Sequence, residues 1–261
     1  MRIKIIQKII DKIRGKRDRC IFVGNFKTFE EASSKCKGYS AQNILDKTLD
    51  AVLKVKNGEA VFERDSAIFD TVQYSFQMLS ALFKAGIENN NQLNVLDFGG
   101  SLGSHYFQNK DFLKPIKINN WTVVEQPHYV KVGNEQIADG ILNFKNSIDE
   151  VQDADILILS SVLQYLPNPY EFAEKFANTG IKYILIDRTP FALKEEKLTI
   201  QIVPKCLYKA EYPAWFLDEN KIKEIFSKKY EIMYEYELPE YNYSSKIPQH
   251  HMCWLFKKKE D

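Results

Sequence analysis

From residue 91 onward, short apolar runs alternate with stretches whose apolar residues recur at helical spacing. The apolar runs are Asn94–Phe98, Trp121–Glu125, Ile141–Phe144, Ile156–Ser160 and Tyr183–Asp187. The helical stretches cover 104–113, 128–138, 169–178 and 218–228. This alternation predicts a parallel sheet with helices on both faces, which is an α/β fold.

The end of the chain departs from this alternation. The strand expected at Tyr230–Leu238 is followed by one at Met252–Lys257, with only Pro239–His251 between them. That linker is too irregular for a crossover helix, so we expect the last two strands to pair antiparallel. The pattern thus predicts five parallel strands and a terminal antiparallel hairpin.

The first 90 residues have a different pattern and are predicted to be mainly helical. Helical spacing covers 41–55 and 66–85, and the second of these helices is expected to end at Gly86. A shorter helix is expected from Phe29 to Gly38, with Thr28 as its N-cap and Glu31 at the capping-box position. Residues 20–26 look like a short extended piece and a turn. We therefore divide the chain into a helical N-terminal region, 1–90, and a second domain, 91–261.

Residues 1–19 form a separate pattern of their own. An isoleucine stripe at helical spacing faces a surface rich in lysine and arginine, and consists of Ile3, Ile6, Ile10 and Ile13. Such a basic amphipathic helix can pack on its own domain, pack on another subunit, or lie on an anionic membrane surface. The first two of these interpretations are favoured by the lysine- and isoleucine-rich composition of the whole chain.

The distribution of charge also separates residues 1–20 from the rest of the chain. The 261 residues hold 36 Lys+Arg and 35 Asp+Glu, a net charge of +1. Residues 1–20 hold eight basic and two acidic residues (8 − 2 = +6), so the remainder carries −5. A basic segment precedes a mildly acidic body, and the near-zero balance argues against nucleic acid as a partner. The composition, 44% hydrophobic, also excludes a disordered tail or a disulfide miniprotein.

The cysteines and the hydropathy predict a cytoplasmic protein. Four cysteines are scattered without a C-x-x-C pair, as is typical of a reducing compartment: Cys20, Cys36, Cys206 and Cys253. No apolar run approaches the roughly 18 residues of a membrane span. The only membrane contact we expect is peripheral, at the inner face of the membrane through residues 1–19.

A glycine loop follows the first strand of the second domain. The segment Val95-Leu96-Asp97-Phe98-Gly99-Gly100-Ser101-Leu102-Gly103 runs from an apolar strand into glycines and then a helix. Glycines let the backbone approach a ligand closely, and a helix N-terminus offers free N–H groups. A nucleotide-like ligand at the carboxyl edge of the sheet is the expected occupant. The dinucleotide fingerprint fails here because Phe98 stands at its first glycine. An acid two residues before the first glycine is instead the pattern of S-adenosylmethionine (SAM) methyltransferases.

Two further strand ends carry polar residues. Glu125 ends the second strand, 22 residues after Gly103, where a carboxylate can accept both hydrogen bonds of a ribose diol. NAD enzymes use the same device, so Glu125 alone does not discriminate. The segment Ile156–Pro167 contains Ser160, Ser161, Gln164 and Tyr165 at the end of its strand. Methyltransferases often carry a similar segment, which lines the methionine and adenine side of their cofactor.

Together these segments resemble class I SAM-dependent methyltransferases, over roughly 91–261. A narrower resemblance, to a bacterial methyltransferase family encoded in O-antigen and capsule gene clusters, spans nearly the whole chain. It is carried by Leu96–Gly100, Gly103–Phe107, Val124–Pro127, Val162–Leu166, Ile186–Phe191 and Tyr212–Phe216, and by the turns at Gly24–Phe26 and Gly38–Tyr39. Ser101 departs from that family, since many relatives carry a third glycine there.

The resemblance implies S-adenosyl-L-methionine as methyl donor, S-adenosyl-L-homocysteine (SAH) as product, and a glycan-related acceptor. Its implied cofactor-binding residues are Asp97, Gly99, Gly100, Ser101, Gly103, Glu125, Gln126, Ser160, Ser161 and Gln164. Asp97 and Glu125 are expected to favour a cationic cofactor, and the N-terminal region is expected to cover the acceptor side.

Methyl transfer is an in-line displacement, which alignment of the two reactants promotes and a general base assists. His105, one turn into the helix after the glycine loop, is a candidate base or a packing residue. Asp187 and Arg188 end the fifth strand on the acceptor side, where Arg188 can hold a phosphate or carboxylate or pair with Asp187. His128 is expected near the adenine.

Other aromatic and metal-ligating residues are interpreted more plainly. Tyr212 and Trp215 can stack on a sugar or close the core. His250, His251 and Cys253 cluster in sequence, but strand alternation sends His251 and Cys253 to one face and His250 to the other. With no fourth ligand nearby, we expect no metal.

Three hypotheses follow. The leading one is a SAM-dependent O-methyltransferase acting on a sugar or a glycan substituent in surface-polysaccharide biosynthesis, with a small-molecule or glycan-linked acceptor. The second is a nicotinamide-dependent sugar-modifying enzyme, which Phe98 and the lack of a Tyr-x-x-x-Lys pair disfavour. The third is a non-catalytic partner protein that keeps the SAM-binding fold.

Overall fold

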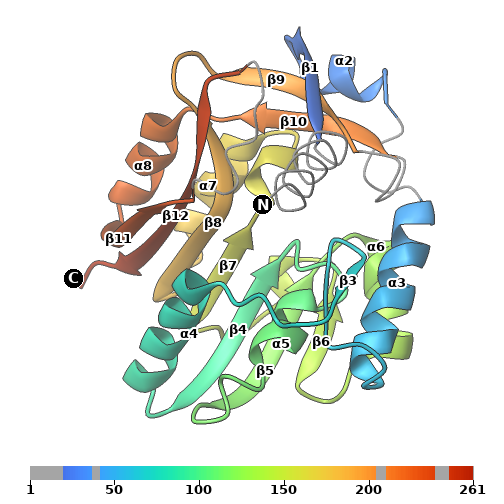
Figure 1. The fold of residues 1–261 in the computed structure, drawn as a ribbon. Helices are drawn as coiled ribbons and strands as arrows, with labels where there is room; N and C mark the ends of the chain where they lie inside the picture. Colours follow the sequence, from blue (N-terminus) through green and yellow to red (C-terminus); the bar gives the residue numbers. More distant parts are fainter. Residues whose placement is uncertain (1–19, 37–41, 204–209, 239–246, 261) are drawn as a thin grey trace, which may run out of the picture.

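A seven-stranded sheet forms the centre of the computed structural model, which describes residues 20–36, 42–203, 210–238 and 247–260 (Figure 1). Its strands are β4 (Gln92–Phe98), β5 (Lys117–Val124), β6 (Leu142–Lys145), β7 (Ile156–Ser160), β8 (Tyr183–Ala192), β11 (Tyr230–Glu237) and β12 (Gln249–Lys258). They lie in the order β11-β12-β8-β7-β4-β5-β6. The five strands from β6 to β8 are parallel, and β12 is antiparallel to both β8 and β11. The expected α/β, Rossmann-like sheet with its terminal antiparallel hairpin is confirmed.

Helices bury both faces of this sheet, which is why its central strands are apolar on both sides. One face packs against α3 (Gln42–Lys56), α4 (Phe76–Glu88), α5 (Ser104–Asn109) and α6 (Pro127–Val132). The other face packs against α7 (Pro169–Ala177) and α8 (Glu219–Ser227). Alternation along β4 sends Val95 to the first core and Leu96 to the second. The four helices expected in the second domain are confirmed, although α5 ends at Asn109 and α6 continues as a π-helical turn, Gly133–Ile137.

The N-terminal region is only partly helical. Residues 21–26 are strand β1 (Ile21–Phe26), and α2 (Phe29–Ser33) begins after Thr28, whose hydroxyl accepts the Glu31 N–H at 3.1 Å as expected. Helix α3 confirms the expected helix over 41–55. Helix α2 ends at Ser33, so the expected end at Gly38 is wrong. The expected basic helix over 1–19 lies outside the described residues.

The expected helix over 66–85 is wrong in its first half. Strands β2 (Phe62–Arg64) and β3 (Ala67–Phe69) form a hairpin, and α4 begins only after Ser75, which caps the Met78 N–H. The turn residues Asp65 and Ser66 both have left-handed φ, 51° and 67°, which no helix allows. The helix also runs past Gly86 and ends at Glu88. A Cβ at Gly86 would lie 2.7 Å from Ile116, so this glycine allows close packing and does not end the helix.

A second, three-stranded antiparallel sheet covers one end of the molecule (Figure 1). It joins β1 to β9 (Lys197–Ile202) and β9 to β10 (Glu211–Phe216). Strands β9 and β10 follow β8 in the chain, so this sheet brings together segments from the two ends of the sequence. The described N-terminal region therefore holds strands as well as the expected helices, and both its role as an acceptor-side cap and the division of the chain at residue 90 stay predictions. No helix in the described part of the chain has the length and apolarity that crossing a bilayer requires.

Candidate functional site

Three residues with left-handed backbone conformation lie near the carboxyl ends of three parallel strands. Ser101, Ser161 and Arg188 have φ of 55°, 54° and 50° and lie just past β4, just past β7 and within β8. Each is a non-glycine residue for which this conformation is unfavourable, and such strain concentrates at functional sites. Because β4, β7 and β8 are neighbours in the sheet, the three strained residues meet at one edge.

The glycine loop packs so tightly that its glycines cannot carry a side chain. A Cβ at Gly99, whose φ is 72°, would lie 2.5 Å from Cγ2 of Val162. A Cβ at Gly100 would lie 2.5 Å from the Asp97 carboxylate, and one at Gly103 2.7 Å from Leu142. Gly99 and Gly100 line a cavity, whereas Gly103 begins α5 and serves packing against β6.

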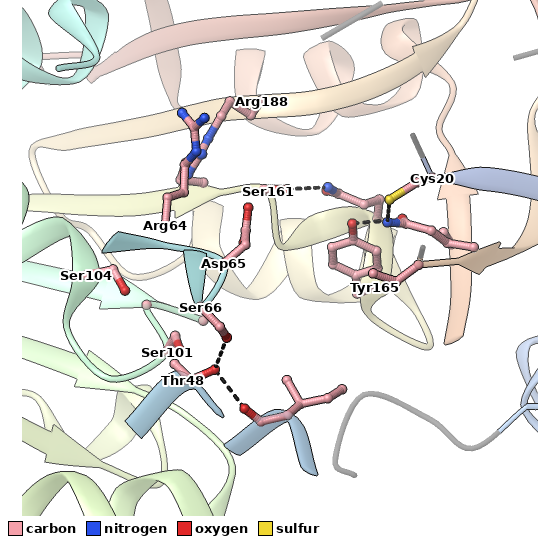
Figure 2. Close-up of a pocket in the computed structure, with 18 of the residues that line it drawn as sticks. Cys20, Thr48, Arg64, Asp65, Ser66, Ser101, Ser104, Ser161, Tyr165 and Arg188 are labelled. Atoms are coloured by element: carbon pink, nitrogen blue, oxygen red, sulfur yellow. Dashed lines mark hydrogen bonds between the residues drawn. The ribbon is translucent and has the colours of Figure 1, made fainter. Parts of the chain in front are cut away.

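Two cavities meet at this edge and share Gly99, Ser161 and Tyr165. The glutamate cavity, about 370 Å³, contains Glu125 and Gln126. Its apolar lining includes Phe98, Val124, Ile148, Val162, Leu166, Phe172 and Phe176, and Asn146, Ser147 and Lys175 add polar groups. The arginine cavity, about 260 Å³, is more polar and contains both Arg64 and Arg188 (Figure 2). The two cavities thus offer one apolar and one polar compartment, joined across the glycine loop.

Glu125 is the carboxylate among the described residues that line the glutamate cavity. Its carboxylate accepts the Gln126 N–H at 2.7 Å and the backbone N–H of Ser101. Burial nevertheless raises the pKa of Glu125 to about 7, and the nearby negative charge of Asp97 adds to the rise. The sequence placed Glu125 at this edge correctly, and a ligand that donates hydrogen bonds there would favour its ionised form.

Asp97 lies beneath the glycine loop and lines neither cavity. Its side chain is completely buried, and it accepts hydrogen bonds from Trp121 Nε1 at 3.2 Å and from His105 Nδ1 at 3.1 Å. The structure therefore does not bring Asp97 into direct contact with cavity contents, contrary to the expected contact with a cofactor's cationic groups. It holds His105 and lies under Gly100.

His105 connects Asp97 to Arg188. Its Nε2 lies 3.1 Å from Nη2 of Arg188, and an arginine can only donate. This geometry assigns Nε2 as an acceptor and the proton to Nδ1, which faces Asp97. The lone pair that a general base needs is thus engaged by Arg188. We therefore interpret His105, a candidate base from sequence, as a positioning residue.

Ser160 and Asp187 hold the other side of Arg188. The Ser160 hydroxyl donates to Asp187 Oδ2 at 2.8 Å and accepts from Arg188 Nε at 3.2 Å and from Nη2 at 3.0 Å. Arg188 Nε also lies 3.4 Å from Asp187 Oδ2. A bulge opposite Cys253 accompanies the left-handed φ of Arg188. Ser160 lines the arginine cavity, where its hydroxyl serves this network, and its expected contact with the cofactor stays a prediction.

Gln164 and Ser161 stand at the junction of the cavities. The Gln164 amide donates to Ser161 Oγ at 2.8 Å, drawn in Figure 2. Its Oε1 is buried and has no hydrogen-bond partner among the described residues. A buried acceptor without a partner is costly, so a ligand that donates a hydrogen bond there would satisfy it.

His251 lines the arginine cavity and was not predicted to do so. It is buried, and alternation along β12 sends Cys253 to the same face and His250 to the other, as expected, where His250 lies 2.9 Å from Glu219. Burial, His250 and Arg188 lower the pKa of His251 to about 4, so it is neutral at pH 7. Among the described residues no group of three His, Cys, Asp or Glu side chains could hold a metal ion.

The remaining candidates fall into two groups. Tyr212 and Trp215 line the arginine cavity and are anchored, Tyr212 by Gln201 at 3.3 Å and Trp215 by the Leu166 carbonyl at 3.2 Å. His128 packs edge-on against Tyr129 and lines neither cavity, and its expected place near an adenine stays a prediction.

Comparison with known proteins identifies no family. No family model matches the chain, and no curated protein matches it. Among solved structures, a Burkholderia thailandensis 1,6-didemethyltoxoflavin-N1-methyltransferase with bound SAH is 12% identical with a TM-score of 0.44, covering 91% of this chain and 93% of its own. A Synechocystis magnesium protoporphyrin IX methyltransferase with bound SAM is 14% identical with a TM-score of 0.46, covering 82% and 97%. A Methanosarcina mazei SAM-dependent methyltransferase is 13% identical with a TM-score of 0.46, covering 67% and 98%. Similarity at this level does not specify a reaction, which has to be inferred from the site.

Proposed function

We propose that this chain is a SAM-dependent methyltransferase. The observation that carries the proposal is the arrangement at the sheet edge: a glycine loop that admits no side chain, with Glu125 beside it at the end of the next strand. The strand order, in which only β12 is reversed, supports it, because a terminal antiparallel hairpin is what the resemblance to class I methyltransferases implies.

The residues of the glutamate cavity fit the adenosine half of this cofactor. The apolar walls around Val124, Ile148 and Phe172 suit a flat base, and Glu125 can accept both hydroxyl protons of a ribose. The buried Gln164 Oε1 suits a donor such as the cofactor's ammonium group. A dinucleotide is disfavoured because Phe98 stands at the first glycine of its fingerprint.

The cofactor supplies a methyl group on a cationic sulfur, and the chain's own residues align the acceptor. The glycine loop and Ser161 hold the junction between the cavities, so the reactants meet across it. Asp97, through His105, fixes the orientation of Arg188 at the acceptor side. In this proposal Asp97, Ser160 and His105 are positioning residues.

We propose a sugar hydroxyl, on a glycan or one of its substituents in surface-polysaccharide biosynthesis, as the methyl acceptor. The arginine cavity presents hydroxyl, amide and aromatic side chains, among them Thr48, Gln201 and Trp215, which suit a sugar. His251 supplies a neutral imidazole there, and we assign it a hydrogen bond to the acceptor hydroxyl. His251→Phe, which removes this hydrogen bond, should lower kcat/KM roughly tenfold and leave the Kd for SAM unchanged.

A thermal-shift titration tests the cofactor first. SAM and SAH should each raise the melting temperature, and NAD should not. Stabilisation by NAD with none by SAM or SAH would contradict the proposal and favour a nicotinamide-dependent enzyme. Binding of SAM without methyl transfer to any surface-glycan fraction of a cell extract would favour a non-catalytic partner protein. Transfer is measured with methyl-labelled SAM, as a mass increase of one methyl group.

Peripheral membrane contact through residues 1–19 is a separate proposal that rests on sequence alone. Sedimentation with anionic lipid vesicles should carry the full chain and leave a 1–19 deletion in the supernatant. Sedimentation of both proteins, or of neither, would contradict it.

A further inference from the structure

Glu63 is a buried carboxyl group that lines the arginine cavity. It belongs to β2 and is only 2% exposed. Its Oε1 accepts a hydrogen bond from the Ser104 hydroxyl, and its Oε2 accepts one from the Ser66 N–H at 3.3 Å. Each oxygen of a carboxylate has a second lone pair, so both oxygens retain the capacity to accept from a bound molecule.

No basic side chain of the described chain forms an ion pair with Glu63. Burial raises the pKa of Glu63, and the nearby charge of Asp65 adds to the rise. The two hydrogen bonds and His105 act in the opposite direction, and no lysine or arginine is among these influences. A buried carboxylate without a cation beside it is costly, so a cationic ligand would favour its ionised form.

Glu63 lies next to the glycine loop. Its partner Ser104 is the first residue of α5, directly after Gly103, and α5 contacts β2. Figure 2 shows Ser101 and Ser104 on the side of the cavity where the hairpin turn carries Ser66. A ligand that extends from the glutamate cavity across the loop therefore enters the arginine cavity beside this carboxyl group.

The hairpin that carries Glu63 is anchored at both of its ends. Besides the hydrogen bond to α5, the Ser66 hydroxyl lies 2.9 Å from that of Thr48 on α3 (Figure 2). At the open end of the hairpin the Phe62 and Phe69 rings lie 5.7 Å apart. A two-stranded hairpin alone is marginally stable, so these contacts fix the position of the carboxyl group.

The methionine end of SAM carries two positive charges, an ammonium and a sulfonium, against one carboxylate. From sequence, Asp97 is the expected partner of these charges, but it lies beneath the loop and lines neither cavity. The described lining of the arginine cavity has two carboxyl side chains, Glu63 and Asp65. Asp65 is exposed at the tip of the hairpin, where water solvates its charge. Glu63 is therefore the buried carboxyl group on the far side of the loop.

We propose that Glu63 binds the ammonium group of the cofactor, in place of the enclosed Asp97. The inference rests on the proposed methyltransferase function and adds to that site a binding residue from outside the central sheet. An ammonium group has three N–H donors, so Glu63 and the buried Oε1 of Gln164 do not compete for it. The hairpin then contacts the cofactor as well as the space for the acceptor.

Isothermal titration with two ligands tests this assignment. SAH has the ammonium group but no sulfonium, and 5′-methylthioadenosine keeps the adenosine and the sulfur but lacks the amino-acid end. Glu63→Gln keeps an acceptor for Ser104 and removes the charge. It should weaken SAH binding by roughly tenfold or more and leave binding of 5′-methylthioadenosine within about twofold.

Glu59→Gln is the matched control, because it makes the same chemical change at an exposed carboxyl just before the hairpin. Both affinities should be unchanged in this variant. The melting temperature of each variant establishes that it is folded. If Glu63→Gln does not fold, Ser104→Ala serves instead, because it removes the hydroxyl that orients the carboxyl group and should weaken SAH binding alone by roughly threefold or more.

Three results would overturn the role of Glu63 and leave the proposed function standing. These are unchanged SAH binding in Glu63→Gln, equal weakening of both ligands, and tighter SAH binding, which would place Glu63 against the carboxylate of the cofactor instead of its ammonium. Failure of wild type to bind either ligand would overturn the proposed function first.

Discussion

The two cavities that meet at the glycine loop are built in different ways. The glutamate cavity lies between the ends of neighbouring parallel strands and the turns that follow them, so one sheet positions most of its walls. The arginine cavity is assembled from β1, the β2–β3 hairpin, α3, the central sheet and the β9–β10 hairpin. The first therefore depends on a widespread topology, and the second on contacts particular to this chain. In a methyltransferase this is the division expected between a common cofactor and a specific acceptor.

The largest loss of SAH affinity should come from adding a side chain at Gly99, where the two cavities meet. Gly99→Ala places a Cβ 2.5 Å from the Val162 side chain at a φ of 72°, so either the glycine loop or the segment after β7 that carries Val162 has to shift. We expect SAH affinity to fall by roughly 100-fold or more and stability to fall by about 2 kcal/mol. Isothermal titration and urea unfolding measure the two effects.

Gly58→Ala is the matched control for this substitution. Gly58 has nearly the same φ, 76°, but a Cβ there would meet nothing within 4 Å. It should lose only the conformational term, about 1 kcal/mol, with unchanged SAH binding. Equal losses of affinity in both variants would mean that the effect is global instead of local to the junction.

A second prediction concerns the charge of the glutamate cavity. The pKa of Glu125 is raised to about 7, and a ribose diol should bind its ionised form. SAH affinity should therefore increase as pH rises from 6 to 8, by about tenfold, because the carboxyl loses its proton in that interval. Glu125→Gln should abolish this pH dependence and weaken binding at pH 8 by roughly tenfold or more.

Glu135→Gln, at an exposed carboxyl on the π-helical turn, should leave both the affinity and its pH dependence unchanged. If SAH affinity still depends on pH in Glu125→Gln, another group is responsible for that dependence. The proposed electrostatic role of Glu125 in the glutamate cavity would then be wrong.

The sequence predicted the glutamate cavity better than the arginine cavity. Apolar runs such as Ile156–Ser160 identify their strands directly because both faces are buried, and the carboxyl ends of parallel strands must meet. The positions of Glu125, Ser161 and Gln164 follow from that rule. For Asp97 the sequence predicted its position beside the glycine loop but not its hydrogen bonds. Only the three-dimensional structure shows that the Asp97 carboxylate accepts hydrogen bonds from Trp121 and His105.

The acceptor side was poorly predicted for an equally physical reason. Ile68 and Val72 fit a helical stripe, but Glu63 and Ser66 are held by Ser104 and Thr48 in a hairpin, and tertiary contacts override spacing. The alternation of Leu198 and Ile200 with polar residues favours a strand, yet its partner β1 lies at the other end of the chain. Pairing between such distant segments is not encoded in local periodicity.

A third prediction concerns the link between the cavities. His105→Asn should leave the buried Asp97 without its imidazole partner and lower the free energy of unfolding by about 1–3 kcal/mol in urea. The control, His250→Asn, removes a half-buried histidine beside Glu219 on the opposite face and should cost less than about 1 kcal/mol. Nitrogen NMR of the wild-type imidazole should show the proton on Nδ1, and a proton on Nε2 would contradict the assigned contact with Arg188.

The smallest effect should come from Ser101, the position where the resembling family often has glycine. Its φ of 55° is unfavourable for serine by about 1–2 kcal/mol, whereas glycine adopts it freely but is more costly to order by about 0.5–1 kcal/mol. Ser101→Gly should therefore stabilise the protein by about 0.5–1 kcal/mol and raise the melting temperature by a few degrees. SAH affinity should stay within about twofold, because the backbone N–H that faces Glu125 is retained. In the control Ser34→Gly, at a φ of −62° on the exposed end of α2, the ordering cost and the loss of the Ser34 Oγ hydrogen bond to the Glu31 carbonyl both apply, so that variant should be less stable than wild type. If Ser101→Gly instead destabilises the protein or weakens SAH binding, the serine hydroxyl contributes to the site, and the cofactor side is then as particular to this chain as the acceptor side.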